Sequence, residues 1–289
     1  MNAPSTAPRS AIVEEQRAAD QALKAKHRAM WAFGDYDAVS VEVISDLGPT
    51  IVDALQIAAD DRVLDIAAGS GNASIPAASR GATVVASDLT PELLETGRQR
   101  AERMGISLEW QEADAENLPY DDASFDVVMS TVGVMFAPHH QIAADELLRV
   151  TRSGGRIGLI NWTPEGFIGQ LFATMKPFAA PPAPGSSPAP LWGSEEHVRE
   201  LFGDRATGLT AQRRQLSVPV FATGAAFRDY FRSNYGPTIA AYRGLADDPT
   251  RTQELDAALE ELGDRYATGT EEGAVGMQWE YLLVTATRV

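Results

Sequence analysis

Short apolar runs alternate with helical patterns through the middle of the chain. Runs rich in aliphatic residues predict strands at residues 62–66, 83–87, 107–111, 125–130 and 156–161. Helical patterns between them predict helices at residues 71–80, 91–104 and 140–151. Strands that alternate with helices in this way are typical of a parallel sheet covered on both faces, joined by right-handed crossovers. The pattern therefore predicts an α/β fold of the doubly wound, Rossmann-like type.

Before this region, apolar positions recur with helical spacing. Leu23, His27, Met30 and Trp31 fall on one face of a helix predicted over residues 11–33. A second helix is predicted from residue 36 to residue 47, where Gly48-Pro49 is expected to end it, and a third over residues 50–57. The first ten residues are polar and rich in proline, which predicts a disordered tail and no signal peptide.

The pattern changes after residue 162. The stretch "PFAAPPAPGSSPAP" has too many prolines for a continuous helix or a central strand, and it predicts a loop that lies on the surface or arches over a ligand. Beyond it we predict helices at residues 195–202, 224–234 and 250–267 and a strand at 215–220. The closing "MQWEYLLVTATRV" alternates two faces and predicts a terminal strand.

These patterns predict five parts of the chain. They are a tail (1–10), an N-terminal helical lid (11–49), a cofactor-binding core (50–162), a substrate-side cap with further sheet elements (163–272) and a terminal strand (273–289).

Composition narrows the function. The chain of 289 residues carries a net charge of −16, from 24 Lys and Arg against 40 Asp and Glu, and has no basic run of four residues. A nucleic-acid partner is therefore not expected. No apolar run approaches the roughly 18 residues of a membrane span, and the absence of cysteine excludes disulfides and thiolate metal sites. We expect a cytoplasmic protein without a membrane partner, while the sequence does not indicate the oligomeric state.

A glycine-containing loop follows the first core strand in "VLDIAAGSGNASI", residues 63–75. Gly69 and Gly71 allow a tight turn that directs backbone N–H groups and a helix N-terminus at a ligand. The segment 69–74 departs from the dinucleotide fingerprint G-x-G-x-x-G at its sixth position, where Ser74 stands, and no P-loop pattern occurs in the chain. The loop predicts a nucleoside cofactor without specifying which one.

Two acidic residues at strand ends indicate which kind of nucleoside cofactor the loop binds. Asp65 ends the first strand directly before the loop, where a carboxylate repels a pyrophosphate and suits a cationic amino group. Asp88 ends the second strand, where a carboxylate accepts hydrogen bonds from the ribose hydroxyls of an adenosine cofactor. The pair favours an adenosine cofactor with a positive charge and no phosphate. A nicotinamide-dependent oxidoreductase is disfavoured but stays open as an alternative.

Four segments, in order and at normal spacing, resemble motifs of the class I S-adenosylmethionine (SAM)-dependent methyltransferases of the UbiE-like, small-molecule type. "VLDIAAGSGN" resembles the first motif and "VVASDLTPELL" the ribose-binding strand end. "EADAENLPYDDASFDVVMS" resembles the adenine-contacting turn and fourth strand, and "AADELLRVTRSGGRIGLINW" the following helix, GG turn and fifth strand. The chain departs from the pattern at Ala67, where many members have glycine. The resemblance implies a seven-stranded sheet, mostly parallel, with the last strand in sequence antiparallel, and SAM as the cofactor.

The resemblance also implies a set of cofactor-binding residues. Asp65 would hold the methionine end of SAM, Asp88 the ribose hydroxyls, and Asp114 the exocyclic amine of adenine. The other implied contacts come from the loop, the strand ends and the N-terminal lid: Ala67, Gly69, Gly71, Leu89, Ala115, Ser130, Val132, Trp31 and Tyr36.

Methyl transfer requires little catalytic machinery, because good positioning supplies much of the acceleration. If the acceptor must lose a proton, His139 and His140, just beyond the fourth strand, are the candidate general bases. A metal site is not predicted, because the chain has four His, no Cys and no ligand pair at helical spacing.

Aromatic residues predict the acceptor pocket, since a flat or apolar acceptor suits such a lining. The candidates are Phe136, Trp162, Phe167, Trp192 and Tyr235. The expected function is methyl transfer from SAM to an oxygen, nitrogen or carbon atom of a small molecule. A non-catalytic, SAM-binding regulatory protein is the second alternative, because the cofactor motifs alone do not require turnover.

Overall fold

The computed structural model describes residues 9–267 and 276–289. Its centre is a seven-stranded sheet with the strand order β3-β2-β1-β4-β5-β7-β6. Strands β1 to β5 pair in parallel, and β7 is antiparallel to both β5 and β6. The predicted doubly wound fold with an antiparallel terminal strand is confirmed. The strands are β1 (Arg62–Ile66), β2 (Thr83–Asp88), β3 (Glu109–Glu112), β4 (Phe125–Thr131), β5 (Thr151–Trp162), β6 (Ala206–Val218) and β7 (Met277–Arg288).

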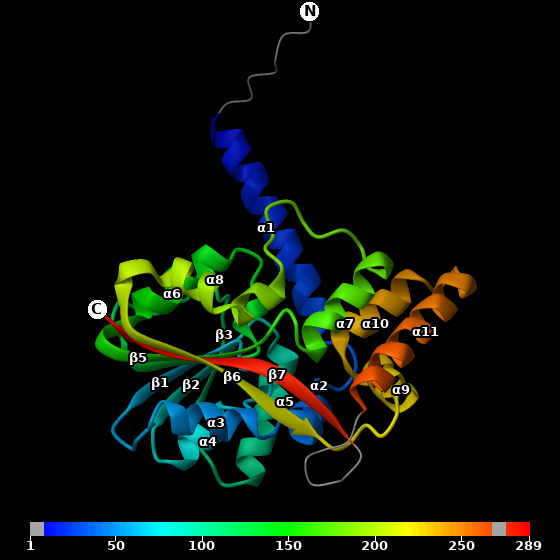
Figure 1. Ribbon diagram of the computed structural model, residues 1–289. Coiled ribbons are helices and arrows are strands. Elements are labelled where there is room, and N and C mark those ends of the chain that lie inside the picture. Colours follow the sequence, from blue (N-terminus) through cyan, green and yellow to red (C-terminus); the bar gives the residue numbers. More distant parts are fainter. Residues whose placement is uncertain (1–8, 268–275) are drawn as a thin grey trace, which may run out of the picture.

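Helices cover both faces of the sheet, as Figure 1 shows. On one face lie α3 (Leu47–Ala54), α4 (Ser74–Ser79) and α5 (Pro91–Arg103), and on the other lie α6 (His140–Val150) and α8 (Glu195–Phe202). Pro91 stands at the first position of α5, where its missing N–H costs no hydrogen bond. Central strands are buried on both sides, which accounts for the nearly continuous apolar runs in β1 and β4.

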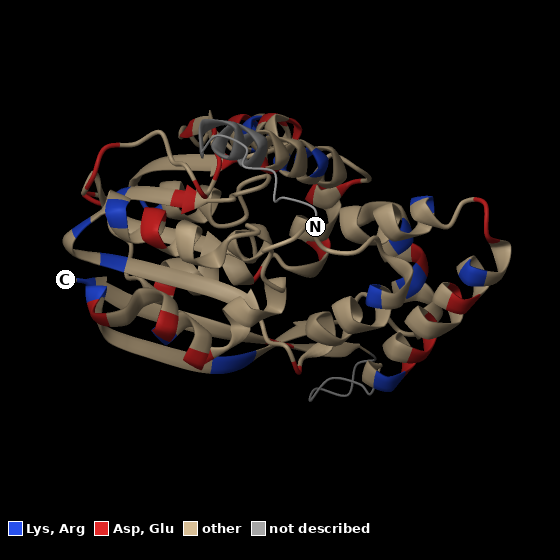
Figure 2. Cartoon of the chain, turned by 90° about the horizontal axis from the view of Figure 1, so that it is seen from above, with Lys and Arg blue, Asp and Glu red and all other residues tan. Residues whose placement is uncertain are grey.

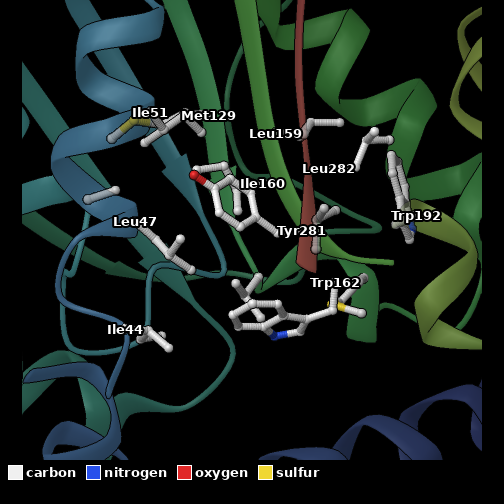
Figure 3. Close-up of a cluster of buried hydrophobic side chains, with 14 of the residues drawn as sticks. Ile44, Leu47, Ile51, Met129, Leu159, Ile160, Trp162, Trp192, Tyr281 and Leu282 are labelled. Carbon is white, nitrogen blue, oxygen red and sulfur yellow. The ribbon is translucent and has the colours of Figure 1, made fainter. Parts of the chain in front are cut away.

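The alternation of side chains along each strand supplies two cores, one above and one below the sheet. Figure 3 shows Leu159, Leu282 and Trp192 on one side of strands β5 and β7, and Ile51 and Ile160 on the other. All of these side chains are buried.

A second group of helices packs together beyond one end of the sheet (Figure 1). It consists of α7 (Phe167–Met175), α9 (Gly224–Asn234), α10 (Gly236–Gly244) and α11 (Pro249–Tyr266). Short 3-10 turns lie at Val134–Phe136, Lys176–Phe178, Ala189–Gly193 and Gly203–Arg205. Acidic and basic positions are interspersed over the helices of the molecule, as Figure 2 shows.

The N-terminal part consists of helix α1 (Arg9–Trp31), helix α2 (Tyr36–Ala38) and a π-helical turn, Val39–Val43. Helix α1 contacts α10, and its first half projects away from the sheet (Figure 1). Of the predicted tail, residues 1–8 lie outside the described residues, and Arg9 and Ser10 belong to α1.

Several predicted boundaries were wrong. Gly48-Pro49 does not end a helix but lies in the first turn of α3, where proline is tolerated. Strand β6 begins at Ala206, well before the predicted residue 215, and helices α7 and α10 were not predicted at all. The boundary predicted between residues 272 and 273 lies outside the described residues. Among the helices that the structure describes, none is long and apolar enough to cross a membrane.

Candidate functional site

A cavity lies at the carboxyl ends of β1, β2 and β4, the edge at which ligands bind in open α/β folds. The loop after β1, the turns after β2 and β4, the turn at residues 113–115 and the N-terminal helices all contribute to its wall. The structure thus brings together most of the residues that the sequence predicted for cofactor binding: Trp31, Tyr36, Ala67, Gly69, Asp88, Leu89, Asp114, Ala115 and Val132.

Three residues predicted for cofactor binding do not line this cavity, and the structure gives each a supporting contact. Asp65 Oδ2 accepts a hydrogen bond of 2.6 Å from Ser74 Oγ, beneath the loop. Ser130 Oγ donates to the carbonyl of Ile66, 2.7 Å away. Gly71 lies so close to Trp110 that an added Cβ would be 2.6 Å from that ring. These contacts shape the loop from behind.

Two residues other than glycine hold left-handed backbone conformations at the cavity wall. Ala67 has φ +53° and Val132 has φ +63°, a region that β-branched side chains rarely adopt. Gly133 lies between these two turns, and an added Cβ there would be 2.2 Å from the carbonyl oxygen of Ala67. The turns after β1 and β4 are therefore in direct backbone contact.

Asp88 organises the loop as well as the cavity. Its Oδ2 accepts from the backbone N–H of Gly69 and its Oδ1 from that of Thr90, both at 2.8 Å. Burial raises the pKa of Asp88 above its ordinary value. Burial, reinforced by nearby Asp88, also raises the pKa of Asp65 to about 7. The site therefore holds two poorly solvated carboxyl groups, which a cationic ligand would stabilise in their ionised form.

Several polar atoms at the cavity have no hydrogen-bond partner among the described residues. The hydroxyls of Ser40, Ser70 and Thr131 are buried without a partner, and all three residues line the cavity. Buried polar groups are nearly always satisfied in a complete assembly. The three hydroxyl groups at the cavity therefore fit a ligand that is itself rich in polar groups.

Helix α1 supplies a wall that sequence reasoning identified only in part. Trp31 lies edge-on to Phe136, with ring centroids 4.6 Å apart, and edge-on to Tyr36 at 5.3 Å. Lys24 and His27 also line the cavity and were not predicted there. The spacing of Lys24, His27 and Trp31 by three and four residues places them on one helix face, which was the available signal.

A second, smaller cavity adjoins the first and shares Tyr36, Ile44 and Val132 with it. The rest of its lining is apolar or aromatic: Val39, Trp162, Ile168, Phe231, Tyr235 and Trp279. No acidic residue, lysine, arginine or histidine belongs to this lining.

Of the residues predicted for the acceptor pocket, some line a cavity and others lie in the core. Phe136 lines the first cavity, and Trp162 and Tyr235 line the second. Phe167 instead stacks on Trp279 in the core at 5.0 Å, and Trp192 packs beside His140, with ring centroids 5.5 Å apart. Neither of these two is among the residues that line the cavities.

Neither of the two candidate general bases lines either cavity. His139 Nδ1 lies 3.0 Å from Glu116 Oε2. His140 is buried, and its Nδ1 lies 2.9 Å from Nε2 of His197. The geometry does not favour proton abstraction by either ring, because neither residue is part of a cavity wall.

Asp20, Glu116 and His139 place possible metal-ligand atoms within 4.8 Å of one another. The ammonium group of Lys24 already bonds to Asp20 and Glu116, at 2.9 Å each. The chain therefore supplies its own cation to this cluster, and we propose no metal there.

Comparisons with known proteins agree with this geometry. The methyltransferase domain family matches residues 64–159. An uncharacterized protein of Mycobacterium tuberculosis, Rv1405c, is 51% identical over 269 residues, which cover 93% of this chain and 96% of the relative. A demethylmenaquinone methyltransferase of Clavibacter sepedonicus is 44% identical over 99 residues, covering 34% of this chain and 40% of that protein.

Similarity to solved structures extends over most of the fold. The YcgJ protein of Bacillus subtilis superimposes with a TM-score of 0.58 at 19% identity, covering 84% of this chain and 98% of that one. The sheet order, the family match across the core and the cavity at the strand ends lead to one assignment. The chain belongs to the class I SAM-dependent methyltransferases.

Proposed function

We propose that this protein transfers a methyl group from SAM to a small, uncharged acceptor whose reacting end is apolar or aromatic. One observation carries the proposal. The cavity at the strand ends, whose lining includes Lys24, Asp88 and Asp114, and the smaller cavity beside it, whose lining has no charged residue, share three common walls: Tyr36, Ile44 and Val132. Such an arrangement suits an adenosine cofactor and an apolar acceptor that meet at these residues, and the second cavity, whose free volume is about 10 Å³, must widen to admit the acceptor.

The residues of the first cavity fit SAM. We assign the ribose hydroxyls to Asp88, the adenine ring to Asp114, Ala115 and Leu89, and the methionine end to the backbone of Ala67 and Gly69. The unpartnered hydroxyls of Ser40, Ser70 and Thr131 offer further polar contacts. Asp65 acts from behind the loop, where its buried charge favours a cationic ligand.

When bound, SAM supplies an electrophilic methyl group on a sulfonium whose departure as a thioether is favourable. The aromatic rings of Trp31, Tyr36 and Phe136 enclose this part of the cavity and limit access of water. Because the second cavity has no acidic or basic lining residue, we propose that the chain accelerates the reaction by alignment. The acceptor is then a neutral nucleophile that has no proton to lose, or a phenol or enol that releases its proton to solvent as the methyl group is transferred.

Titration calorimetry tests the cofactor. We expect SAM and S-adenosylhomocysteine to bind in the micromolar range and NAD not to bind. Asp88→Asn should weaken both interactions at least tenfold, because it removes a charged hydrogen-bond acceptor. Asp122→Asn is the matched control, since the side chain of Asp122 is 80% exposed. Binding of NAD alone would contradict the proposal and favour an oxidoreductase.

Turnover distinguishes an enzyme from a regulatory protein that only binds SAM. Release of S-adenosylhomocysteine should be measured over a panel of neutral phenols and enols, with carboxylated analogues of each in parallel. We expect turnover with neutral compounds and little with their charged analogues. Cofactor binding without turnover on any compound of the panel would favour the regulatory alternative.

A further inference from the structure

Lys24 occupies an unusual position for a charged residue on the N-terminal helix. Its ammonium lies 2.7 Å from Asp114 Oδ2, 2.9 Å from Asp20 Oδ2 and 2.9 Å from Glu116 Oε2. A lysine ammonium has three N–H donors, so these carboxylates use all of them. The Lys24 side chain is 15% exposed and that of Glu116 is 2% exposed, so water screens these ion pairs poorly.

The carboxylate of Asp114 is fixed from two directions. Its Oδ1 accepts a hydrogen bond of 2.9 Å from the backbone N–H of Glu116, within its own turn. Its Oδ2 is held by Lys24, which comes from a helix distant in sequence. A carboxylate oxygen has two lone pairs, so Asp114 can still accept a hydrogen bond from a ligand in the cavity that it lines.

Helix α1 and the turn at residues 113–117 are therefore joined at the cavity itself. Glu116 extends the connection, because its Oε1 accepts from the backbone N–H of His139 at the start of α6. Burial alone would lower the pKa of Lys24, but hydrogen bonds with Asp114, Asp20 and Glu116 outweigh it and raise that pKa. Lys24 therefore carries its positive charge at neutral pH.

We infer that Lys24 is a positioning residue that sets Asp114 for recognition of the exocyclic amine of adenine, and so couples docking of α1 to cofactor binding. The inference rests on the proposed function, in which the first cavity holds SAM. A fixed carboxylate accepts from the amine of adenine and repels the carbonyl that replaces this amine in hypoxanthine. Without Lys24, Asp114 loses one of its two anchors, and this discrimination should weaken.

The test compares two cofactor products that differ at this group and at the adjacent ring nitrogen. S-adenosylhomocysteine carries the amine and an unprotonated N1, and S-inosylhomocysteine carries a carbonyl and an N1–H. Both dissociation constants are measured by calorimetry for the full chain and for Lys24→Met, which keeps the length of the side chain and removes the charge. We expect the wild-type protein to prefer S-adenosylhomocysteine by tenfold or more, roughly the effect of one hydrogen bond to a charged group. In Lys24→Met this preference should fall by about tenfold.

Lys26→Met is the matched control, because Lys26 is an exposed residue of the same helix and the change in net charge is identical. Lys24→Arg should restore much of the preference, since a guanidinium also donates to carboxylates. If Lys24→Met does not fold, as judged by thermal unfolding, Lys24→Gln replaces it, because an amide retains one donor for Asp114.

Several results would overturn the inference. Equal weakening of both ligands in Lys24→Met would indicate a purely structural role, and the same loss of preference in Lys26→Met would indicate a general effect of charge. Failure of the wild-type protein to bind S-adenosylhomocysteine would instead refute the proposed function and this inference with it. Wild-type binding with an unchanged preference in Lys24→Met refutes the inference alone.

Discussion

His140 Nδ1 lies 2.9 Å from His197 Nε2, so two imidazole rings join helices α6 and α8 beneath the surface. Trp192 lies beside His140, with ring centroids 5.5 Å apart. One ring must be a donor and the other an acceptor, and this requires at least one neutral ring. Protonation of both rings removes the hydrogen bond.

This pair predicts an acid-sensitive fold. Burial, with a contribution from His197, lowers the pKa of His140 from 6.5 to about 4. Between these values the unfolded chain binds a proton at this position and the folded chain does not, so stability decreases as the pH falls. We expect His140 to contribute a loss of about 2 kcal/mol in the free energy of unfolding between pH 7 and pH 4. Urea denaturation at a series of pH values measures this loss.

His140→Met should make the pH profile flatter, because it removes the titrating ring from the buried pair. His139→Gln serves as the control, since it leaves His140 and His197 unchanged. An equally steep profile in His140→Met would show that other groups cause the acid sensitivity.

The buried charge of Asp65 should lower the stability of the fold while it strengthens SAM binding. In the folded state the pKa of Asp65 is about 7, above the ordinary 3.8. The ionised carboxylate therefore destabilises the folded state, and this loss of stability is largest above pH 7. Asp65→Asn keeps the shape and can still accept from Ser74 without a buried charge. At pH 8 we expect it to raise the free energy of unfolding by roughly 1–3 kcal/mol and to weaken SAM binding.

Asp126→Asn is the control for which the opposite change in stability is expected. Hydrogen bonds from Arg152 and from the backbone of Arg62 lower the pKa of Asp126, so loss of its charge should reduce stability. Denaturation and calorimetry at pH 8 measure both variants. A less stable Asp65→Asn protein would contradict the assignment of Asp65 as a poorly solvated charge.

Gly48 determines how closely α3 approaches the cofactor loop. An added Cβ would lie 1.9 Å from the carbonyl oxygen of Asn72, which is backbone and cannot turn aside. Gly48→Ala should therefore destabilise the protein by about 1–3 kcal/mol or more and weaken SAM binding through the displaced loop. Gly244→Ala, at an exposed helix end with no atom within 4 Å, should be neutral. Thermal unfolding with and without SAM measures both effects.

Ile168 offers a direct test of the acceptor side. It is buried in α7 and lines only the second cavity. We expect Ile168→Trp to prevent the second cavity from widening and to reduce turnover at least tenfold, while affinity for S-adenosylhomocysteine reports on the first cavity and thermal unfolding reports on core packing. Ile142→Trp, at a position that is 47% exposed, is the control. Unchanged turnover in Ile168→Trp would place the acceptor elsewhere.

The sequence predicted the core of the fold because local pattern and burial agree there. Strand β1 and helices α8 and α9 have the predicted bounds, since apolar runs and caps coincide with them. Helix α7 was missed because the prolines that follow it dominated the pattern of its region. The first half of β6 was missed because it is an edge strand with a largely exposed, polar sequence.

The same reasoning explains which site residues were predictable. Asp88 and Asp114 follow strands whose carboxyl ends meet at one edge, so position in sequence implies position in space. Helical spacing places Lys24 on one face with His27 and Trp31, but its carboxylate partners depend on how α1 docks, which no local pattern encodes. The contacts of His139 and His140 with Glu116 and His197 join different elements of the fold, so only coordinates reveal them.

The place of β7 between β5 and β6 has a consequence for biosynthesis. On the ribosome, β5 and β6 are both synthesised before β7, the strand that pairs with each of them. The edge of β5 therefore stays unpaired while more than a hundred further residues are added to the chain. Exposed edges of this kind pair readily with other chains. Production of this protein should therefore depend on chaperones that shield β5 until β7 arrives.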